Sequence, residues 1–239
     1  KMRAAKGIPS TAAITPIQFC EKYCQYVDEG YTDVIHVPIN RSGSSTYNNA
    51  VMAQGMLREE RPEHHLNIHL LDPHTYSMVF GWYLCEMARK LQNGAELRHV
   101  ISEFETQMNK MEVILGPYSL KQMKKSGRIS AAAAVMGELM GIRPIITLID
   151  GKTRVESKVR GDDKVIPAMI DLCKKRTEGV EDFDYMIGHT SIPQAAELEK
   201  ACRKAFGKAP LTTFNLGGVV SANTGPDTLA LVYVGKPRD

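Results

Sequence analysis

The chain has 239 residues, of which 43% are hydrophobic and 24% charged, a composition typical of a soluble globular protein with one or two buried cores. Thirty Lys and Arg residues against 27 Asp and Glu leave a net charge of +3, which argues against a nucleic-acid-binding protein. No apolar run approaches the ~20 residues that a membrane span needs, and no signal peptide is recognisable, so we expect a cytoplasmic protein without a membrane span.

The first predicted element is a helix with clear boundaries. Thr15 and Gln18 form a capping box, Pro16 occupies the first helical position, and Gly30 ends the pattern. The elements expected next are a strand over 34–39, a polar loop over 40–45, a helix over 46–59, a strand over 66–71, and two helices, through Trp82 and Met87 and from Gly94 to about Met108. This alternation predicts βαβ units and a parallel sheet. Because the chain enters its first loop without a strand, we expect that a preceding first strand is absent here.

The pattern changes near residue 110, where we place a boundary between an N-terminal α/β domain (1–110) and a C-terminal α/β domain with a mixed sheet (111–239). The elements expected in the second domain are a strand over 112–115, a short helix before Gly127, an Ala-rich helix from Ser130 to Gly141, a hairpin of 145–149 and 154–159 around Asp150-Gly151, a helix from about 162, a strand over 185–188, a helix over 193–206, and strands over 211–216 and 229–234.

The polar loop after the first strand is a candidate anion site. It leads straight into a helix, so hydroxyls of Ser42, Ser44, Ser45 and Thr46 can combine with the unpaired first-turn amides to hold a carboxylate or phosphate. The alternative is an ordinary helix cap, since Ser and Thr are the commonest N-cap residues.

Two further segments contain small residues. The Ala-rich helix has side chains too small to fill much space, so either another backbone packs closely against it or a cavity remains that suits an alkyl chain. Residues 221–225 read as a small polar loop, in which Asn223 can donate a hydrogen bond to an anionic head group.

Signs of catalysis or metal binding are weak. The sequence has no G-x-S-x-G elbow, no Walker A loop and no G-x-G-x-x-G phosphate loop. His189 and His74 could act as bases, but surface or structural roles are more typical. Cys20 and Cys24 are four residues apart without a second pair to complete a zinc site, so we expect five reduced, structural cysteines and no metal.

Four segments agree in order and spacing with one known family. They are residues 10–16, with Thr11 at a family threonine; residues 40–47, with Ser44 at a ligand-binding serine; LDPHTYSM (71–78); and residues 120–161, which contain LKQMKKSGRIS, GELMGIRPIITLIDG and KVRG. Over nearly its whole length the chain resembles the DegV family of bacterial fatty-acid-binding proteins, some of which are acyl-carrying subunits of a fatty acid kinase.

The resemblance implies a two-domain DegV-like fold with head-group contacts from the N-terminal domain and an acyl tunnel in the C-terminal one. It assigns the carboxylate to Thr11, Ser44 and Asn223, and further head-group or partner contacts to Arg160, Arg41, Ser45 and Thr46. It makes the Ala-rich helix a tunnel wall, which favours the cavity over close packing. The wall residues are Ala131, Ala134, Met136, Gly137 and Met140.

The chain departs from the family pattern at the head group. Asn223 stands where a histidine is usual, so imidazolium assistance to a carboxylate or acyl phosphate is lost. Ser45 replaces a glycine, and Asn40-Arg41 replaces a Ser-Ser pair; Arg41 can supply some of the missing positive charge.

We therefore expect a non-enzymatic protein without a cofactor that binds a long-chain fatty acid (C16–C18) and presents its carboxylate to a separate ATP-dependent kinase. Lys124, Lys125 and Arg128 form a candidate docking patch for that kinase. One alternative is an acyl or phosphoryl transferase with Ser44 as nucleophile and His189 or His74 as base. Another is a binding protein for a different small anion, such as a sugar phosphate.

Overall fold

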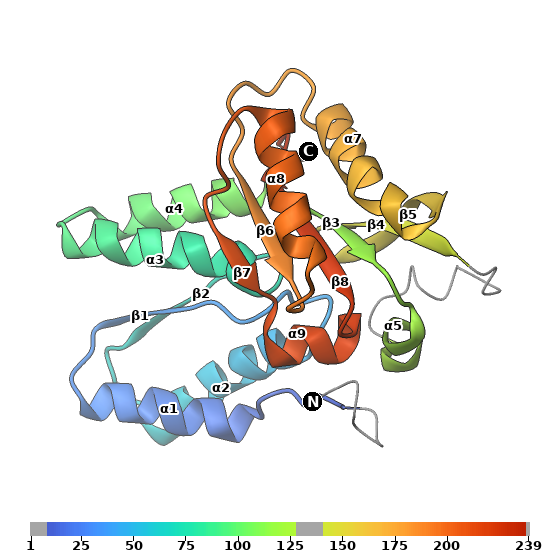
Figure 1. Cartoon of the computed structure of the whole chain (residues 1–239). Helices are drawn as coiled ribbons and strands as arrows, with labels where there is room; N and C mark the ends of the chain where they lie inside the picture. The colour runs from blue at the N-terminus through green and yellow to red at the C-terminus, as the bar shows by residue number, and fades with distance from the viewer. Residues whose placement is uncertain (1–8, 128–140, 238–239) are drawn as a thin grey trace. The chain divides into compact units, whose positions relative to one another are not determined.

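The computed structural model describes residues 9–127 and 141–237 (Figure 1). The chain divides into a small unit, Ala12–Tyr76, and a large unit, which comprises Lys1–Thr11 and Ser77–Asp239. This division differs from the expected boundary near residue 110, because the segment from Ser77 onward groups with the large unit. There the Ser77 hydroxyl donates to the Leu216 carbonyl (3.2 Å) and the Gly235 amide donates to the Lys110 carbonyl (2.8 Å).

The small unit contains two helices and a two-stranded parallel sheet, which confirms the predicted βαβ pattern. Its elements are α1 (Pro16–Asp28), β1 (Asp33–His36), α2 (Thr46–Glu60) and β2 (Asn67–Leu70), with β1 and β2 paired in parallel. The predicted capping box is present: the Thr15 hydroxyl accepts from the Gln18 amide (3.3 Å), and the Gln18 side chain accepts from the Thr15 amide (3.0 Å). Gly30 has a φ of 80° just past the helix end, where glycine avoids strain.

The core of the small unit lies where α1 packs on α2. The buried residues recur at helical spacing on both elements, and small alanines on α2 let the two helices approach closely. The core residues are Phe19, Cys20, Tyr23, Ala50, Ala53, Leu57 and Leu66.

The large unit is built on a six-stranded mixed sheet, as predicted, with strand order β5-β4-β3-β8-β6-β7. Its strands are β3 (Met111–Pro117), β4 (Ile142–Ile149), β5 (Lys152–Arg160), β6 (Tyr185–His189), β7 (Thr213–Asn215) and β8 (Thr228–Val234). All neighbours pair antiparallel except β6 and β7. The predicted hairpin is confirmed, with Asp150 and Gly151 both at positive φ (48° and 71°), as a two-residue turn of this kind requires.

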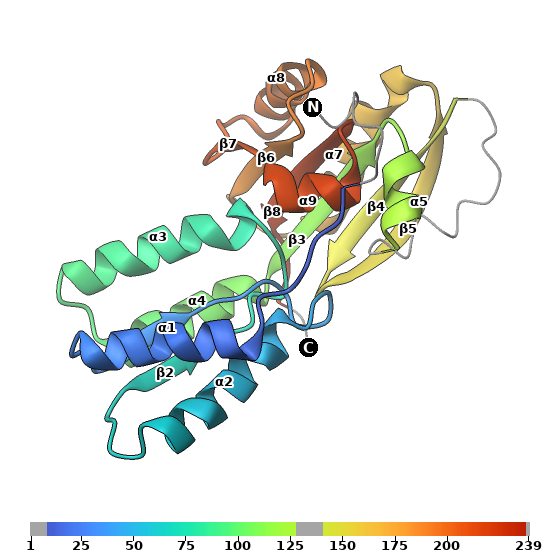
Figure 2. The same cartoon turned by 90° about the horizontal axis from the view of Figure 1, so that it is seen from below.

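The described helices of the large unit are α3 (Met78–Gln92), α4 (Leu97–Met108), α5 (Lys121–Ser126), α7 (Val165–Arg176), α8 (Gln194–Phe206) and α9 (Gly217–Thr224), with a 3₁₀ turn, η2, at Asp162–Lys164. α7 and α8 share one core with the central strands, so they cover the same face of the sheet (Figures 1 and 2). α3 packs on α4, and α5 packs on α9.

The sheet register separates two apolar faces. Opposed residues of antiparallel strands point to the same side, so Ile114, Leu231 and Ile187 lie together on the helix-covered face, whose core they join. Gly116 is on that face because a Cβ there would lie 2.4 Å from the Met169 sulfur of α7. We call the opposite side the second face; its buried residues include Val113, Leu115, Ile146, Met186, Ala230 and Val232.

One element was predicted wrongly. Residues 221–225 read as a loop, but the structure places 221–224 in α9. Two glycines and two valines give this segment low helix propensity, so packing against α5 outweighs the local preference. The Asn215 side chain accepts from the Gly217 amide (3.0 Å) at the start of the helix, and Gly225, at φ 89°, follows its end. Of the Ala-rich helix expected from Ser130 to Gly141, only Gly141 lies within the described residues.

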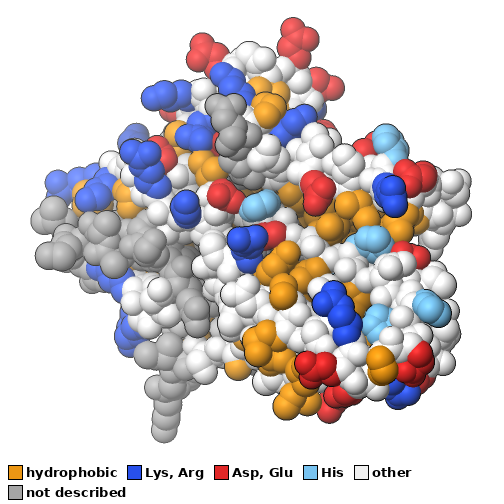
Figure 3. Space-filling model, turned by 180° about the vertical axis from the view of Figure 1, so that it is seen from behind, with side chains coloured by type: hydrophobic (Ala, Val, Ile, Leu, Met, Phe, Trp, Pro, Cys, Tyr) orange, Lys and Arg blue, Asp and Glu red, His pale blue; other side chains and the backbone are white. Residues whose placement is uncertain are grey.

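The surface matches the small net charge. On the described residues of the face shown in Figure 3, acidic and basic side chains are interspersed rather than gathered into a stripe of one sign. None of the helices that the structure describes combines the length and apolarity required to cross a bilayer.

Candidate ligand-binding site

The serine loop (residues 40–46) joins β1 to α2 and is organised by Asn40, which is only 1% exposed. The Asn40 side-chain oxygen accepts from both the amide (2.9 Å) and the hydroxyl (3.0 Å) of Ser42, while its backbone amide donates to the Thr75 carbonyl (3.1 Å). The hydroxyl of Ser42 is therefore engaged within the loop.

The segment after β2 packs directly against the serine loop. A Cβ added at Gly43 would lie 1.7 Å from the Tyr76 hydroxyl oxygen, so only glycine fits beside this ring. Parallel neighbours end at the same edge of a sheet, which explains why the loops after β1 and β2 meet. Two of the motifs that the sequence singled out, the serine loop and residues 71–76, therefore form one structure.

Ser44 and Thr46 form a hydroxyl pair at the start of α2. Their side-chain oxygens are 2.7 Å apart, and the Thr46 amide donates to the Ser44 oxygen (3.2 Å). Two hydroxyls carry two protons and their mutual hydrogen bond uses one, so one proton stays available for an anion whichever residue donates. Ser45 is exposed and makes no side-chain cap bond; its carbonyl accepts from the Asn49 amide (2.8 Å).

Backbone donors accompany this pair. In the part of the chain that the structure describes, the first-turn amides of Tyr47 and Asn48 have no hydrogen-bond acceptor. Such amides, with the positive end of the helix dipole, favour an anion beside them. The loop is thus chemically suited to a carboxylate oxygen.

Arg41 is already paired. Its Nε lies 3.8 Å from Asp72 Oδ2, and its guanidinium carbon lies 5.8 Å from the centre of the Tyr47 ring. The Asp72 side chain is largely buried, and its other oxygen accepts from the His74 amide (2.9 Å). The charge of Arg41 is therefore balanced within the loop region. Arg41 can thus replace less of the positive charge that is lost with the family histidine at position 223 than we expected.

The histidines proposed as bases have other partners. The hydrogen bonds of the Ser44 side chain, within the described residues, go to the Thr46 hydroxyl and amide and to no histidine. His74 Nδ1 lies 3.9 Å from Asp72 Oδ2. His189 Nδ1 accepts from the Ser191 amide (2.9 Å), which is a structural role. This arrangement gives no support to Ser44 as an activated nucleophile.

Asn223 belongs to the large unit, in the last turn of α9. Its side-chain nitrogen donates to the Val219 carbonyl (2.9 Å), which leaves one N–H for a ligand. The adjoining helix α5 holds this turn: Gln122 donates to the Ala222 carbonyl (2.5 Å) and Ser126 to the Asn223 carbonyl (3.3 Å). Lys124 and Lys125, on the same short helix, are exposed.

The other predicted residues are placed as follows. Thr11 is exposed and lies outside the helices and strands of the large unit. Arg160 ends β5 opposite Ile142; it is exposed, and no partner of its side chain is found among the described residues. Arg128 and all five predicted wall residues (Ala131, Ala134, Met136, Gly137 and Met140) lie outside the described residues.

The second face of the sheet has the apolar character that an alkyl chain needs. Val113 stands opposite Val232, and Leu115 opposite Ala230, all at most 5% exposed. At β6, Gly188 leaves room for neighbouring side chains: a Cβ there would lie 2.9 Å from Leu216 Cδ2 and 3.1 Å from Phe214 Cζ. Sequence patterning could not separate this face from the other, because both are apolar.

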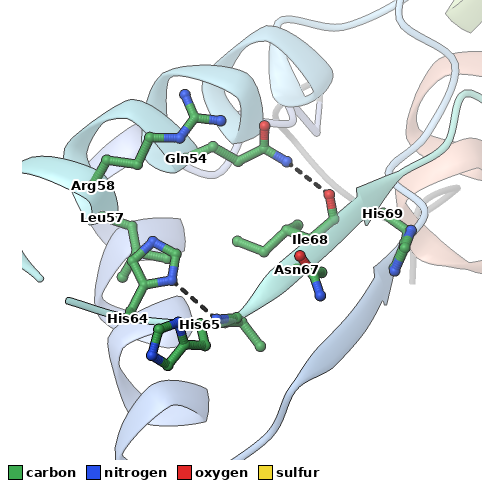
Figure 4. A pocket seen from close by; sticks show the side chains of 9 residues that line it. Gln54, Leu57, Arg58, His64, His65, Asn67, Ile68 and His69 are labelled. Atoms are coloured by element: carbon green, nitrogen blue, oxygen red, sulfur yellow. Dashed lines mark hydrogen bonds between the residues drawn. The ribbon is translucent and has the colours of Figure 1, made fainter. Parts of the chain in front are cut away.

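A cavity of about 730 Å³ lies in the small unit, between α2 and β2 (Figure 4). Its lining is largely polar, so it does not suit an acyl chain. Gln54 donates to the Ile68 carbonyl (3.2 Å), and His64 Nδ1 accepts from the Leu66 amide (3.1 Å). The lining residues are Gln54, Leu57, Arg58, His64, His65, Leu66, Asn67, Ile68 and His69.

Comparison with known proteins points to one family. The family model described as "uncharacterised protein, DegV family" matches residues 1–236. A DegV domain-containing protein of Clostridium perfringens is 29% identical over 232 residues, which cover 95% of this chain and 78% of that protein. A fatty acid binding DegV family protein of Streptococcus agalactiae is 26% identical, with a TM-score of 0.83 over 98% of this chain and 81% of that one.

A second solved structure, a stearic-acid-binding protein of Eubacterium ventriosum, is 20% identical and shares the fold with a TM-score of 0.86, over 98% of this chain and 81% of that one. The fold therefore agrees with the resemblance read from the sequence. Because the family model covers nearly the whole length, the chain belongs to the DegV family.

Proposed function

We propose that this protein binds a long-chain fatty acid and carries it, rather than transforming it. The observation that carries the proposal is its similarity, over 98% of its length, to the fatty acid binding protein of Streptococcus agalactiae. The chemistry of the chain supports it, because one unit offers an apolar sheet face and the other offers hydrogen-bond donors for an anion.

We place the acyl chain along the second face of the sheet. Burial of each methylene contributes about 0.8 kcal/mol, so an alkyl chain gains most from a long apolar surface such as that of Val113, Leu115 and Val232. The tunnel-wall residues Ala131, Ala134, Met136, Gly137 and Met140 remain predictions from the family resemblance.

We assign the carboxylate to the hydroxyl pair of Ser44 and Thr46. The pair keeps one proton to donate, and the amides of Tyr47 and Asn48 add two further donors without a side-chain charge. Contacts from Thr11, Asn223 and Arg160 of the large unit remain predictions from the family resemblance.

We further propose that the bound carboxylate is presented to a separate ATP-dependent kinase, which implies a cytoplasmic location. The sequence has no phosphate loop of its own, and Lys124 and Lys125 are exposed on the helix that holds the Asn223 turn. A cationic imidazole at 223 would assist an acyl phosphate. Asn223→His should therefore raise acyl-phosphate formation with a fatty acid kinase, and no gain would show that the asparagine is neutral.

Native mass spectrometry followed by denaturing extraction tests the binding itself. We expect a co-purifying mass that extracts as a C16 or C18 fatty acid. A protein that is empty and takes up neither palmitate nor oleate would refute the proposal and favour another small anion. Ser44→Ala separates carrier from transferase, because it should weaken lipid retention in a carrier but abolish turnover in an enzyme.

A further inference from the structure

Two cysteines and a carboxylate meet where α1 packs on α2 in the small unit. Cys20 and Cys24 lie one turn apart on α1, and Glu60 is the last residue of α2. One ligand atom from each, the two sulfurs and a carboxylate oxygen, all lie within 4.8 Å of one another. Among the described residues, no other group of three His, Cys, Asp or Glu side chains gathers its ligand atoms this closely.

The helix packing explains why these side chains converge. Residues four apart share one face of a helix, and this face of α1 faces α2, where Cys20 is 2% exposed within the core. Cys24 is half-buried and Glu60 is exposed. The Cys24 thiol donates to Glu60 Oε2 at 3.5 Å, so the contact between the two helices already exists.

We propose that Cys20, Cys24 and Glu60 form a binding site for a thiophilic divalent cation such as Zn²⁺, with water as the fourth ligand. Thiolate and carboxylate are both common zinc ligands. A tetrahedral site with bonds of ~2.3 Å needs the two sulfurs about 3.8 Å apart. The ligand atoms therefore have to move only slightly closer together. The side chains of Cys24 and Glu60 can make this movement, because they are not locked in the core.

Binding at this site would release protons. A free cysteine is mostly a neutral thiol at neutral pH. A metal ion has to displace such protons to gain its thiolate ligands. Glu60 is exposed, Cys24 is half-buried and Cys20 is buried, so an ion can reach the site from solvent by way of Glu60.

The site would act as a clamp between the two helices rather than as part of the fatty acid site. The serine loop is at the first turn of α2 and Glu60 is at its last, about 20 Å away at a rise of ~1.5 Å per residue. Metal binding should therefore stabilise the small unit and leave lipid binding unchanged, which makes this inference independent of the proposed function.

Titration of the reduced, chelator-treated protein with Cd²⁺ and Zn²⁺ tests the proposal. We expect one equivalent of either ion to bind, a thiolate-to-metal charge-transfer band with Cd²⁺, and a higher midpoint of thermal unfolding. Cys24→Ser should abolish the band, and Glu60→Gln should weaken binding by on the order of tenfold or more, the scale of loss that even outer-shell partners of a metal cause.

Matched controls come from the same chain. Cys85→Ser, at an exposed cysteine of α3, and Glu59→Gln, one residue before Glu60, should leave the titration unchanged. Because Cys24 is half-buried, its variant should fold like the parent protein, as thermal unfolding without metal would confirm. Absence of a charge-transfer band, or a band that persists in Cys24→Ser, would overturn the proposal. Zinc bound without thiolate contact would assign the ion to histidines instead and would also overturn it.

Discussion

Enlarging one side chain on the second face of the sheet should shorten the fatty acid that the protein carries. Val232 lies in β8, between β3 and β6, and is fully buried. Its side chain shares the second face with that of Val113, directly across from it. Val232→Phe would place an aromatic ring in the space that we assign to the acyl chain.

The size of the effect follows from the volume added. The substitution adds about four carbon atoms, which take the place of roughly four methylenes worth ~0.8 kcal/mol each when buried. A C18 chain should then lose about 3 kcal/mol, which corresponds to a roughly 200-fold weaker dissociation constant at ~1.4 kcal/mol per factor of ten. A chain shorter by about four carbons should be affected far less, so the bound lipids should shift toward shorter species.

Lipid extraction and chain-length analysis of the purified variant measures this shift. Leu231→Phe is the matched control, because Leu231 is the preceding residue, equally buried, and faces the core under α7 and α8. It should lower the free energy of unfolding by about 1–3 kcal/mol through overpacking without changing the lipids. If Leu231→Phe shortens the bound lipid while a folded Val232→Phe variant does not, the acyl chain does not lie along the second face.

Three further predictions concern the head group and the stability of each unit. Ser44→Ala should weaken fatty acid binding about 10- to 100-fold, since a hydrogen bond to a charged group contributes roughly 1.5–3 kcal/mol, whereas Ser45→Ala should leave binding unchanged. Displacement of a fluorescent fatty acid measures the affinity of both variants. Equal losses in the two variants would contradict the assignment of the carboxylate to Ser44. Glu112→Gln should lower the free energy of unfolding by about 3 kcal/mol. The reason is that the largely buried Glu112 carboxylate pairs with Arg176 (2.5 and 3.0 Å) and accepts from the Tyr233 hydroxyl (2.6 Å). A change below ~0.5 kcal/mol in urea unfolding would show that the pair of Glu112 and Arg176 is not stabilising. Burial lowers the pKa of His36, so the unfolded chain takes up a proton near pH 6.5 that the native chain does not, and stability should fall as the pH drops below about 6.5. His36→Gln should make the midpoint of thermal unfolding depend less on pH. A parent protein that gains stability on acidification would refute this prediction.

Elements with local signals could be predicted from the sequence. The capping box at Thr15 and Gln18, the Asp150-Gly151 turn and the glycine stop after α5 depend on chemistry within a few residues, and the structure confirms all three. α9 could not be predicted, because its helical state depends on packing with α5 from nearly 100 residues earlier. The division into units was missed for a similar reason: composition changes near residue 110, whereas contacts of Ser77 and Lys110 tie the preceding helices to the large unit.

The residues of the serine loop could also be found from the sequence, but not the way they are held. The pairing of Arg41 with Asp72 and the fit of Gly43 under Tyr76 join segments more than 30 residues apart. One signal was available: two strands separated by a helix are parallel neighbours, so the loops that follow them meet at one edge. For the cysteine pair no such signal exists, because Glu60 reaches Cys24 only through the packing of α1 on α2.

The two faces of the large sheet differ in a way that bears on ligand binding. On the helix-covered face, large side chains interlock with the backbone, as where Met169 fills the space above Gly116 and Tyr233 reaches Glu112. On the second face β8 carries Ala230 and Val232 and β6 carries Gly188, all of them small, beside the larger Leu115 and Met186. Small side chains such as those of Ala230 and Val232 have little rotamer freedom to lose, so they add little to the entropic cost of binding. A surface of this kind selects a ligand by its length and apolarity rather than by specific contacts, which is why chain length is the property that a change at Val232 should alter.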